Sequence, residues 1–198
     1  MKRLVIASNN RGKLTEIVAR LRSLEIEAAP QSEFGVTSAE EPYSTFVENA
    51  LAKARHASRL SGLPALADDS GLCVDALDGA PGVHSARFAG PAASDAANNA
   101  KLLESLRGVN DRRAHYVCVI ALLRSESDPR PVICEAEWHG EIIGAPRGRG
   151  GFGYDPLFLV PELMRTGAEL TLEHKNRISH RGKALEQLIE KLRAEREP

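Results

Sequence analysis

The stretch LVIASNNRGKLTEIVARL, residues 4–21, sets the pattern from which the fold is predicted. Its first four residues are apolar, as in a short buried strand. A polar turn, Ser8–Lys13, follows them. Beyond the turn, apolar residues recur at the spacing of a helix that buries one face; they are Leu14, Ile17, Val18, Leu21 and Leu24. The stretch therefore predicts a strand, a turn and an amphipathic helix.

The same alternation continues along the chain and favours an α/β fold with a mixed sheet. Thr45, with Glu48 three residues later, matches a capping box, and Gly62 is a usual helix stop. We expect the helices at 45–61, 94–106 and 179–194, the second capped by Ser94. Strands are expected at 26–29, 63–67, 114–123, 132–143 and 157–160. The strand at 63–67 is expected to break at Asp68, and the two long strands to be antiparallel neighbours.

Composition excludes several classes of protein. The 198 residues carry a net charge of -1, so no global basic field exists to hold a long nucleic acid. No flexible linker divides the chain, which predicts one domain over residues 1–198. Three widely spaced cysteines in apolar runs, Cys73, Cys118 and Cys134, predict buried thiols in a reducing compartment. The run Leu4–Ala7 is too short for a signal peptide or a membrane span, so a cytoplasmic location is expected.

The turn Ser8–Lys13 has the features of an anion site. Backbone N–H groups at a helix start and the helix dipole favour a negative group, and Lys13 adds a positive charge. The turn is not a Walker A loop, because Ala7 replaces its first glycine and Leu14 its Ser or Thr. Taken alone, the segment also fits an ordinary capped helix start with a solvated lysine.

Two acidic pairs suggest a metal site. Asp68 and Asp69 follow an apolar strand directly, and burying them is unfavourable unless a cation or hydrogen-bond donors compensate. Their oxygens suit Mg²⁺, and one of them is placed to take a proton from an attacking water. The structural alternative is a turn in which one aspartate caps a backbone amide. Glu40 and Glu41 lie in a loop before the second helix, where they complete a metal site or form a solvated acidic loop.

Lys53 and the glycine-rich segment Gly148–Pro156 are further candidates. Small neighbours let Lys53 reach a ligand, although a surface lysine is the usual explanation. Glycines let a backbone approach a ligand closely, and Phe152 and Tyr154 are suited to stack on a flat base. Asp155 is suited to accept a hydrogen bond. The alternative is a hairpin connection whose aromatic residues pack in the core.

The segment Ser179–Gly182 places cations where a helix disfavours them. Ser179 is expected to cap the last helix, so His180 and Arg181 fall in its first turn, beside the positive end of the dipole. Unfavourable placements of this kind are often functional. With Lys175, these side chains are suited to donate to a purine carbonyl, or else they pair with acidic neighbours.

Trp138, on the predicted strand at 132–143, is expected to pack in the core.

Taken together, five motifs in order resemble the inosine triphosphate pyrophosphatase family, specifically its bacterial-type XTP/dITP diphosphatases, which act on non-canonical purine nucleoside triphosphates. The motifs are residues 8–13, 67–72, 79–82, 151–156 and 178–182. The resemblance covers nearly the whole chain, although Glu162–Leu172 matches less distinctly. The resemblance implies a Mg²⁺-dependent homodimer whose protomer has an elongated mixed sheet with flanking helices, and two lobes around a central substrate cleft.

The resemblance also implies roles for individual residues. Asp69 would be the general base and, with Glu41, a metal ligand; Asp68 would complete the metal environment, and Glu40 is the alternative to Glu41. The catalytic set would be Asp68, Asp69, Lys13 and Lys53. The residues that hold the triphosphate would be Ser8, Asn9, Asn10, Arg11, Gly12, Lys13, Lys53 and Ser70. Those that recognise the base would be Phe152, Gly153, Tyr154, Asp155, Lys175, His180 and Arg181.

The predicted reaction is hydrolysis of ITP, dITP or XTP to the nucleoside monophosphate and pyrophosphate, which cleans the nucleotide pool. Selectivity is expected at the 6-position of the base, where these substrates carry a carbonyl and ATP carries an amino group. GTP shares the carbonyl, so a further feature must exclude it. The alternatives are a pyrophosphatase for modified pyrimidine or methylated guanine nucleotides, a nucleotide sensor without turnover, and an RNA-binding module using the Arg147–Arg149 loop.

Overall fold

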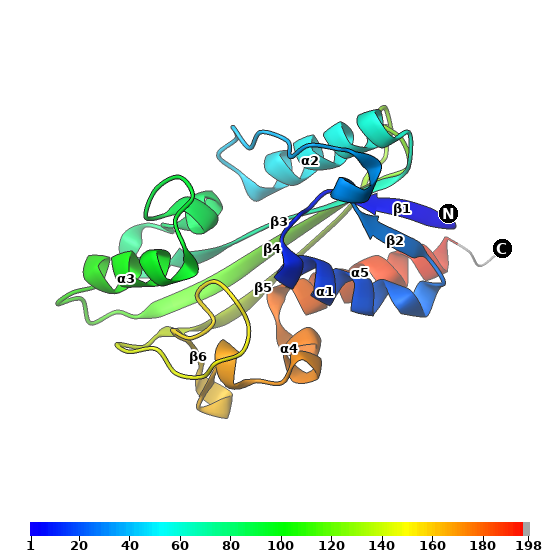
Figure 1. Cartoon of the computed structure of the whole chain (residues 1–198). Coiled ribbons are helices and arrows are strands. Elements are labelled where there is room, and N and C mark those ends of the chain that lie inside the picture. The colour runs from blue at the N-terminus through cyan, green and yellow to red at the C-terminus, as the bar shows by residue number, and fades with distance from the viewer. Residues whose placement is uncertain (196–198) are drawn as a thin grey trace. The chain divides into compact units, whose positions relative to one another are not determined.

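The computed structural model describes residues 1–195, which form a seven-stranded sheet with helices (Figure 1). The strand order is β2-β1-β3-β4-β5-β6-β7. The strands are β1 Arg3–Ile6, β2 Glu27–Pro30, β3 Ala65–Val74, β4 Arg113–Leu123, β5 Val132–Ile142, β6 Phe158–Val160 and β7 Arg165–Thr166. The helices are α1 Arg11–Leu21, α2 Phe46–Ser61, α3 Asp95–Ser105, α4 Leu172–Ile178 and α5 His180–Ala194. Because β1 pairs in parallel with β2 and β3, while β6 pairs antiparallel with β5 and β7, the sheet is mixed, as predicted.

The chain divides into two compact units. The first unit comprises residues 1–69, 118–136 and 181 onwards; the second comprises residues 70–117 and 137–180. Strands β3, β4 and β5 contribute residues to both units. Neither unit is a continuous stretch of sequence, so neither could be separated by cutting the chain once.

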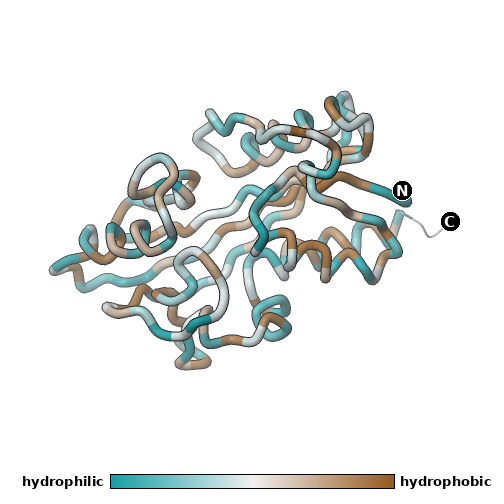
Figure 2. Tube along the Cα trace, viewed as in Figure 1, coloured by the Kyte–Doolittle hydropathy of each residue, from teal (hydrophilic) through white to brown (hydrophobic). Residues whose placement is uncertain are grey.

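The core of the first unit is built from the apolar faces that the sequence predicts. Ile17 and Leu21 of α1 are fully buried against Leu185 and Leu188 of α5 and the inward residues of β1 and β4. The hydrophobic character of β1 is visible along its tube in Figure 2. Burial of apolar surface at about 25 cal/mol per Å² is what holds these helices on the sheet.

The core of the second unit is rich in aromatic rings. Tyr116, Trp138 and Phe158 lie with ring centroids 4.8 to 6.2 Å apart, in tilted and stacked pairs. Leu102 of α3 and Leu157 are fully buried in the same cluster. The prediction that Trp138 packs in the core is therefore confirmed.

Local signals set the helix boundaries as predicted. Thr45 caps α2 by accepting the Glu48 N–H, and Gly62 ends that helix in the left-handed conformation with φ +68°. Ser94 caps α3 in the same way by accepting the Ala97 N–H. Helix α4, capped by Thr171, was not predicted.

Two sequence predictions are wrong. Strand β3 does not break at Asp68 but continues through Asp69 to Val74, since cationic side chains compensate both carboxylates and no turn is needed to solvate them. The prediction of three buried thiols is also wrong, because Cys73 is partly exposed, whereas Cys118 and Cys134 are buried. All three thiols are free.

Within residues 1–195, no helix has the length and apolar character needed to span a bilayer.

Gly71 of β3 gives a test of the close packing in the second unit. A Cβ there would lie 2.2 Å from the Gly82 carbonyl oxygen and 2.6 Å from Ser85 Oγ, which also accepts the Leu72 N–H. We expect Gly71→Ala to lower the free energy of unfolding by about 1–3 kcal/mol in denaturant titration, as overpacked sites do. The control is Gly144→Ala, where a Cβ meets no atom of the described chain within 4 Å. Equal stability of the two variants would contradict this packing.

Candidate functional site

Four charged side chains form a buried cluster in the first unit. Asp68 of β3 accepts from Arg181 Nε of α5 at 2.8 Å and pairs with Lys13 Nζ of α1 at 2.5 Å. Arg181 also donates from Nη1 to Glu16 Oε2 of α1 at 2.5 Å, and Cys118 Sγ lies 3.0 Å from Asp68 Oδ2. Two cations thus face two carboxylates, so the cluster is neutral.

The cluster fixes the charge state of Asp68. Burial alone would raise the pKa of this carboxyl, but the charges of Arg181 and Lys13 outweigh it and hold the pKa well below its usual value. Burial likewise opposes the Arg181 charge, and Asp68 and Glu16 more than compensate, so its pKa is raised. Asp68 is therefore an ionised anchor that fixes Lys13, whose side chain keeps 16% of its surface exposed.

Asp69 has a different environment, because successive residues of a strand point to opposite faces of the sheet. In the first unit, α1 and α5 lie on one face and α2 lies on the other (Figure 1). Asp69 Oδ1 accepts from Lys53 Nζ of α2 at 2.6 Å, and the same ammonium lies 2.8 Å from Glu41 Oε1. Lys53 thus joins the two carboxylates that the sequence analysis assigns to a metal.

The pKa of Asp69 is shifted in the opposite direction to that of Asp68. Burial raises the pKa of the Asp69 carboxyl, and the Lys53 ammonium offsets this only in part. For Lys53, burial alone would lower the pKa, but Asp69 and Glu41 outweigh it and raise the pKa. Neighbouring carboxyl groups with pKa values pushed apart are typical of acid–base sites, and Asp69 is the one better suited to accept a proton.

The oxygens beside Lys53 fit a divalent cation. Asp69 Oδ2 is buried and has no hydrogen-bond partner among residues 1–195. The Glu41 side chain is 28% exposed, and Glu41 rather than Glu40 contacts Lys53. Mg²⁺ is commonly held by one or two carboxylates together with substrate phosphates. Among residues 1–195, no group of three or more His, Cys, Asp or Glu side chains is placed to hold a metal ion.

The N-terminal turn is a capped helix start that carries polar groups. Asn10 caps α1 by accepting the Lys13 N–H at 3.1 Å, and Ser8 Oγ accepts the Asn10 N–H at 3.1 Å. Asn9 Nδ2 donates weakly to Ser38 Oγ at 3.4 Å. Arg11 is exposed and Gly12 is partly exposed in the first turn of α1. The turn and Lys13 therefore present donors at one helix end, next to Asp68.

In the second unit, the glycine-rich segment places three predicted residues together. Asp155 is buried and its Oδ2 accepts from Lys175 Nζ at 2.6 Å and from the Phe152 N–H at 2.9 Å. Lys175 Nζ lies 4.7 Å from the centroid of the half-buried Phe152 ring, in cation–π geometry. A Cβ on Gly151 would lie 2.1 Å from Asp155 Oδ2, which explains why a glycine is needed there.

Three other predicted residues lie in the interior. Tyr154 is 3% exposed and its hydroxyl donates to the Ser85 carbonyl at 2.8 Å, as in the core-packing alternative. His180 is buried and stacks on Tyr116, with ring centroids 4.6 Å apart. Arg181 pairs with acidic neighbours, the alternative considered for it. Phe152 is thus the accessible aromatic residue of the segment, and Ser70, directly after Asp69, is partly exposed.

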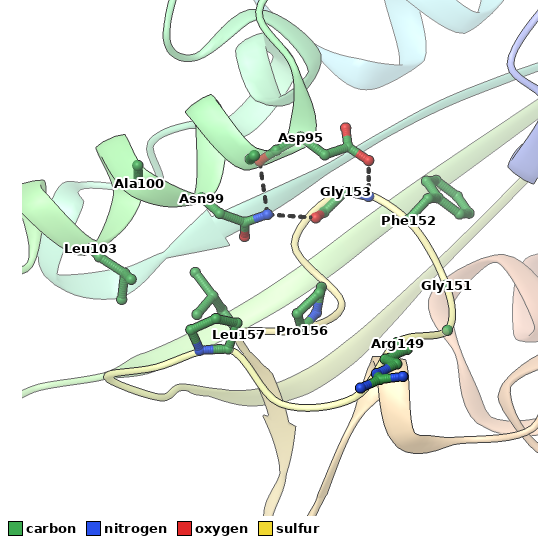
Figure 3. Close-up of a pocket in the computed structure, with 13 residues that line it drawn as sticks. Asp95, Asn99, Ala100, Leu103, Arg149, Gly151, Phe152, Gly153, Pro156 and Leu157 are labelled. Carbon is green, nitrogen blue, oxygen red and sulfur yellow. Dashed lines mark hydrogen bonds between the residues drawn. The ribbon is translucent and has the colours of Figure 1, made fainter.

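Sequence analysis missed the part that α3 plays beside this segment. A groove of about 510 Å³ lies between α3 and the loop in the second unit (Figure 3). Asp95 and Asn99 of α3 contact the backbone of Gly153 there. The sequence does carry a signal for this role: Asp95 and Asn99 are four residues apart, which places both side chains on one face of the capped helix.

Comparison with known proteins gives a consistent picture. The family model described as Ham1 family matches residues 4–191. A protein of Ralstonia nicotianae named dITP/XTP pyrophosphatase is 62% identical over 98% of both chains. One of the same name from Nitrosomonas europaea is 64% identical over 97% of this chain and 95% of its own. The solved structure of a HAM1 protein from Coxiella burnetii is 55% identical, with a TM-score of 0.91 over 98% of this chain and 100% of its own.

The buried pair of Asp68 and Arg181 gives a test by mutation and pH. We expect Asp68→Asn to lower the free energy of unfolding by about 3–5 kcal/mol at pH 7, because it leaves a buried guanidinium without its anion. The pKa of Asp68 is depressed in the folded protein, so its stabilisation is present above its unfolded pKa of about 3.9 and is lost as pH falls through the folded value.

Urea titrations of the wild-type protein and Asp68→Asn between pH 7 and pH 3 measure the difference in their free energies of unfolding. This difference should shrink below about pH 4. Glu104→Gln is the control, since Glu104 pairs with Arg107 on the surface and such pairs contribute little. The same loss of stability at both ends of the pH range would refute the pKa assignment.

Proposed function

The chain belongs to the Ham1 family, and we propose that it hydrolyses the non-canonical purine nucleoside triphosphates ITP, dITP and XTP to the monophosphate and pyrophosphate. The names of the relatives support the substrate class. The observation that carries the proposal is the Asp69 carboxylate, whose Oδ2 is buried and has no hydrogen-bond partner in the described chain, beside Lys53. A binding protein has no need of a carboxylate with a raised pKa beside its phosphate ligands.

The triphosphate would be held by residues of the α1 start together with two lysines. Lys13 is oriented by Asp68, and Lys53 by Asp69 and Glu41. Both ammonium groups would offset the charge that develops on the leaving pyrophosphate. Further donors would come from the turn and from β3; they are Ser8, Asn9, Asn10, Arg11, Gly12 and Ser70.

Asp69 would act as the general base. A water that donates a hydrogen bond to Asp69 attacks the α-phosphorus, its proton passes to the carboxylate, and the bond between the α-phosphorus and the bridging oxygen breaks. Lys53 occupies Oδ1, which leaves Oδ2 for the water or a cation. Mg²⁺, when bound by Asp69 and Glu41 with substrate phosphates, would supply charge neutralisation. Asp68, ionised and held by Arg181, would keep Lys13 in position.

The base would be recognised in the second unit. The half-buried Phe152 ring would stack on the purine, with Gly153, Tyr154 and Asp155 shaping the segment. Positive and donor groups for the 6-carbonyl would come from Lys175 and His180, since the Arg181 guanidinium, also predicted for this role, is bound by Asp68 and Glu16. ATP carries an amino group at this position, which would leave a buried donor unpaired, at a cost of about 1–3 kcal/mol.

The proposal extends to assembly and location. The protein would act as a homodimer in the cytoplasm, as its resemblance to the pyrophosphatase family implies. The three free thiols agree with a reducing compartment. Sedimentation of the purified protein tests the assembly directly.

A substrate panel tests the proposed reaction. Pyrophosphate release should be fast from ITP, dITP and XTP with Mg²⁺, slow from ATP and GTP, and lost when EDTA is added. The assay must separate pyrophosphate from orthophosphate, since the two report different bonds. Release of pyrophosphate from none of the five nucleotides would overturn the proposal and favour a nucleotide sensor without turnover.

Replacing Asp69 tests its role. Asp69→Asn keeps the shape of the side chain but removes the base, so kcat for ITP should fall by about 10²–10⁴-fold. ITP should still bind within a few-fold of the wild-type affinity, measured by calorimetry. Asp78→Asn is the matched control, because Asp78 is exposed and asparagine tolerates its positive φ of 50°. Wild-type turnover in Asp69→Asn would remove Asp69 from the mechanism.

A further inference from the structure

Two side chains on one face of α3 bind the backbone of a single loop residue. Asp95 Oδ2 accepts the Gly153 N–H at 2.7 Å, and Asn99 Nδ2 donates to the Gly153 carbonyl at 2.8 Å (Figure 3). Both hydrogen-bonding groups of Gly153 are therefore bound by a helix that lies more than 50 residues earlier in the chain.

The helix that supplies these side chains is firmly attached to its own unit. Asn99 Nδ2 also donates to the Asp95 carbonyl at 2.8 Å, which fixes the direction of the amide. The neighbouring Asn98 is buried, accepts the Ala89 N–H at 2.8 Å and donates to the Ala86 carbonyl at 3.2 Å. Leu102, one turn later, is fully buried. Side chains on such a packed helix hold a ligand-contacting loop more accurately than loop residues do.

Phe152 lies between Gly153, which α3 holds, and a second hydrogen-bonded point, its own backbone N–H. Its own N–H donates to Asp155 Oδ2 at 2.9 Å. The flanking glycines, Gly151 and Gly153, have φ of +70° and +62°, a left-handed conformation that glycine adopts readily. Beyond Gly153 the chain is held by Tyr154, whose hydroxyl donates to the Ser85 carbonyl, so the bonds from α3 are the side-chain contacts that fix Gly153 itself. Asp95 and Asn99 therefore help to set the direction of the Phe152 ring, together with Asp155 and Lys175.

We propose that Asp95 and Asn99 are positioning residues that hold Phe152 in place for stacking on the nucleobase. This inference rests on the function proposed above, in which Phe152 contacts the base. Neither side chain touches the reacting phosphates in that scheme, because the groups assigned to them belong to α1, α2 and β3. The two residues would therefore govern affinity and base selectivity, not the rate of the chemical step.

The test is a comparison of KM and kcat in variants of α3. A neutral hydrogen bond contributes about 0.5–1.5 kcal/mol, which corresponds to about 2–10-fold in affinity. We expect Asn99→Ala to raise KM for ITP by about 3–10-fold and to lower the ratio of kcat/KM for ITP over ATP, with kcat for ITP changed by less than about 2-fold. Loss of folded protein would lower the apparent kcat and leave KM unchanged, so the two effects are separable.

Conservative variants distinguish positioning from packing. Asp95→Asn keeps an oxygen that accepts the Gly153 N–H and should retain the wild-type KM, whereas Asp95→Ala should raise it. Asn99→Asp places an acceptor against the Gly153 carbonyl, so it should behave like Asn99→Ala. Ala100→Ser is the matched control, because Ala100 is an exposed α3 residue that lines the same groove.

Each outcome has a distinct meaning. Raised KM in Asn99→Ala, Asn99→Asp and Asp95→Ala, with wild-type values in Asp95→Asn and Ala100→Ser, supports the inference. Unchanged KM in Asn99→Ala and Asp95→Ala, with normal turnover by the wild-type protein, overturns the inference alone. Absence of pyrophosphate release by the wild-type protein overturns the proposed function, and the inference with it.

Discussion

The pairing of Asp68 with Arg181 is the interaction on which the first unit depends. A carboxylate in the middle of a central strand is tolerable only when a cation with matching geometry is buried beside it. Arg181 supplies that cation from α5 and also binds Glu16, so one guanidinium links β3, α1 and α5. Because Asp68 in turn holds Lys13, the same interaction that secures two helices on the sheet places a positive charge at the start of α1.

The alternation of a β-strand then gives two neighbouring aspartates different chemistry. Asp68 points towards α1 and α5, where Lys13 and Arg181 keep it ionised. Asp69 points towards α2, where it forms an ion pair with Lys53. Their pKa values shift in opposite directions for this reason. A single strand can therefore place an ionised carboxylate and a carboxyl with a raised pKa at adjacent positions, provided that different helices cover its two faces.

The sequence predicts those features that depend on nearby residues. Thr45, Gly62 and Ser94 set helix ends through bonds to residues close in the chain, and the apolar spacing of α1 and α5 predicts their buried faces. The continuation of β3 through Asp68 could not be predicted, because Arg181 lies 113 residues away. For the same reason, sequence alone could not separate Phe152, which stays accessible, from Tyr154, whose hydroxyl reaches Ser85 in the core. The five motifs predict the candidate residues only when they are taken as a set, because the chemistry of each motif alone also fits an ordinary structural role.

The central claim is that water attacks the α-phosphorus, beside which the proposal places Asp69. Hydrolysis of ITP in water enriched with ¹⁸O, followed by mass spectrometry of both products, tests it most directly. The account predicts that the label enters the phosphate of the nucleoside monophosphate and is absent from pyrophosphate. Label in pyrophosphate would place the attack on the β-phosphorus and would contradict the account.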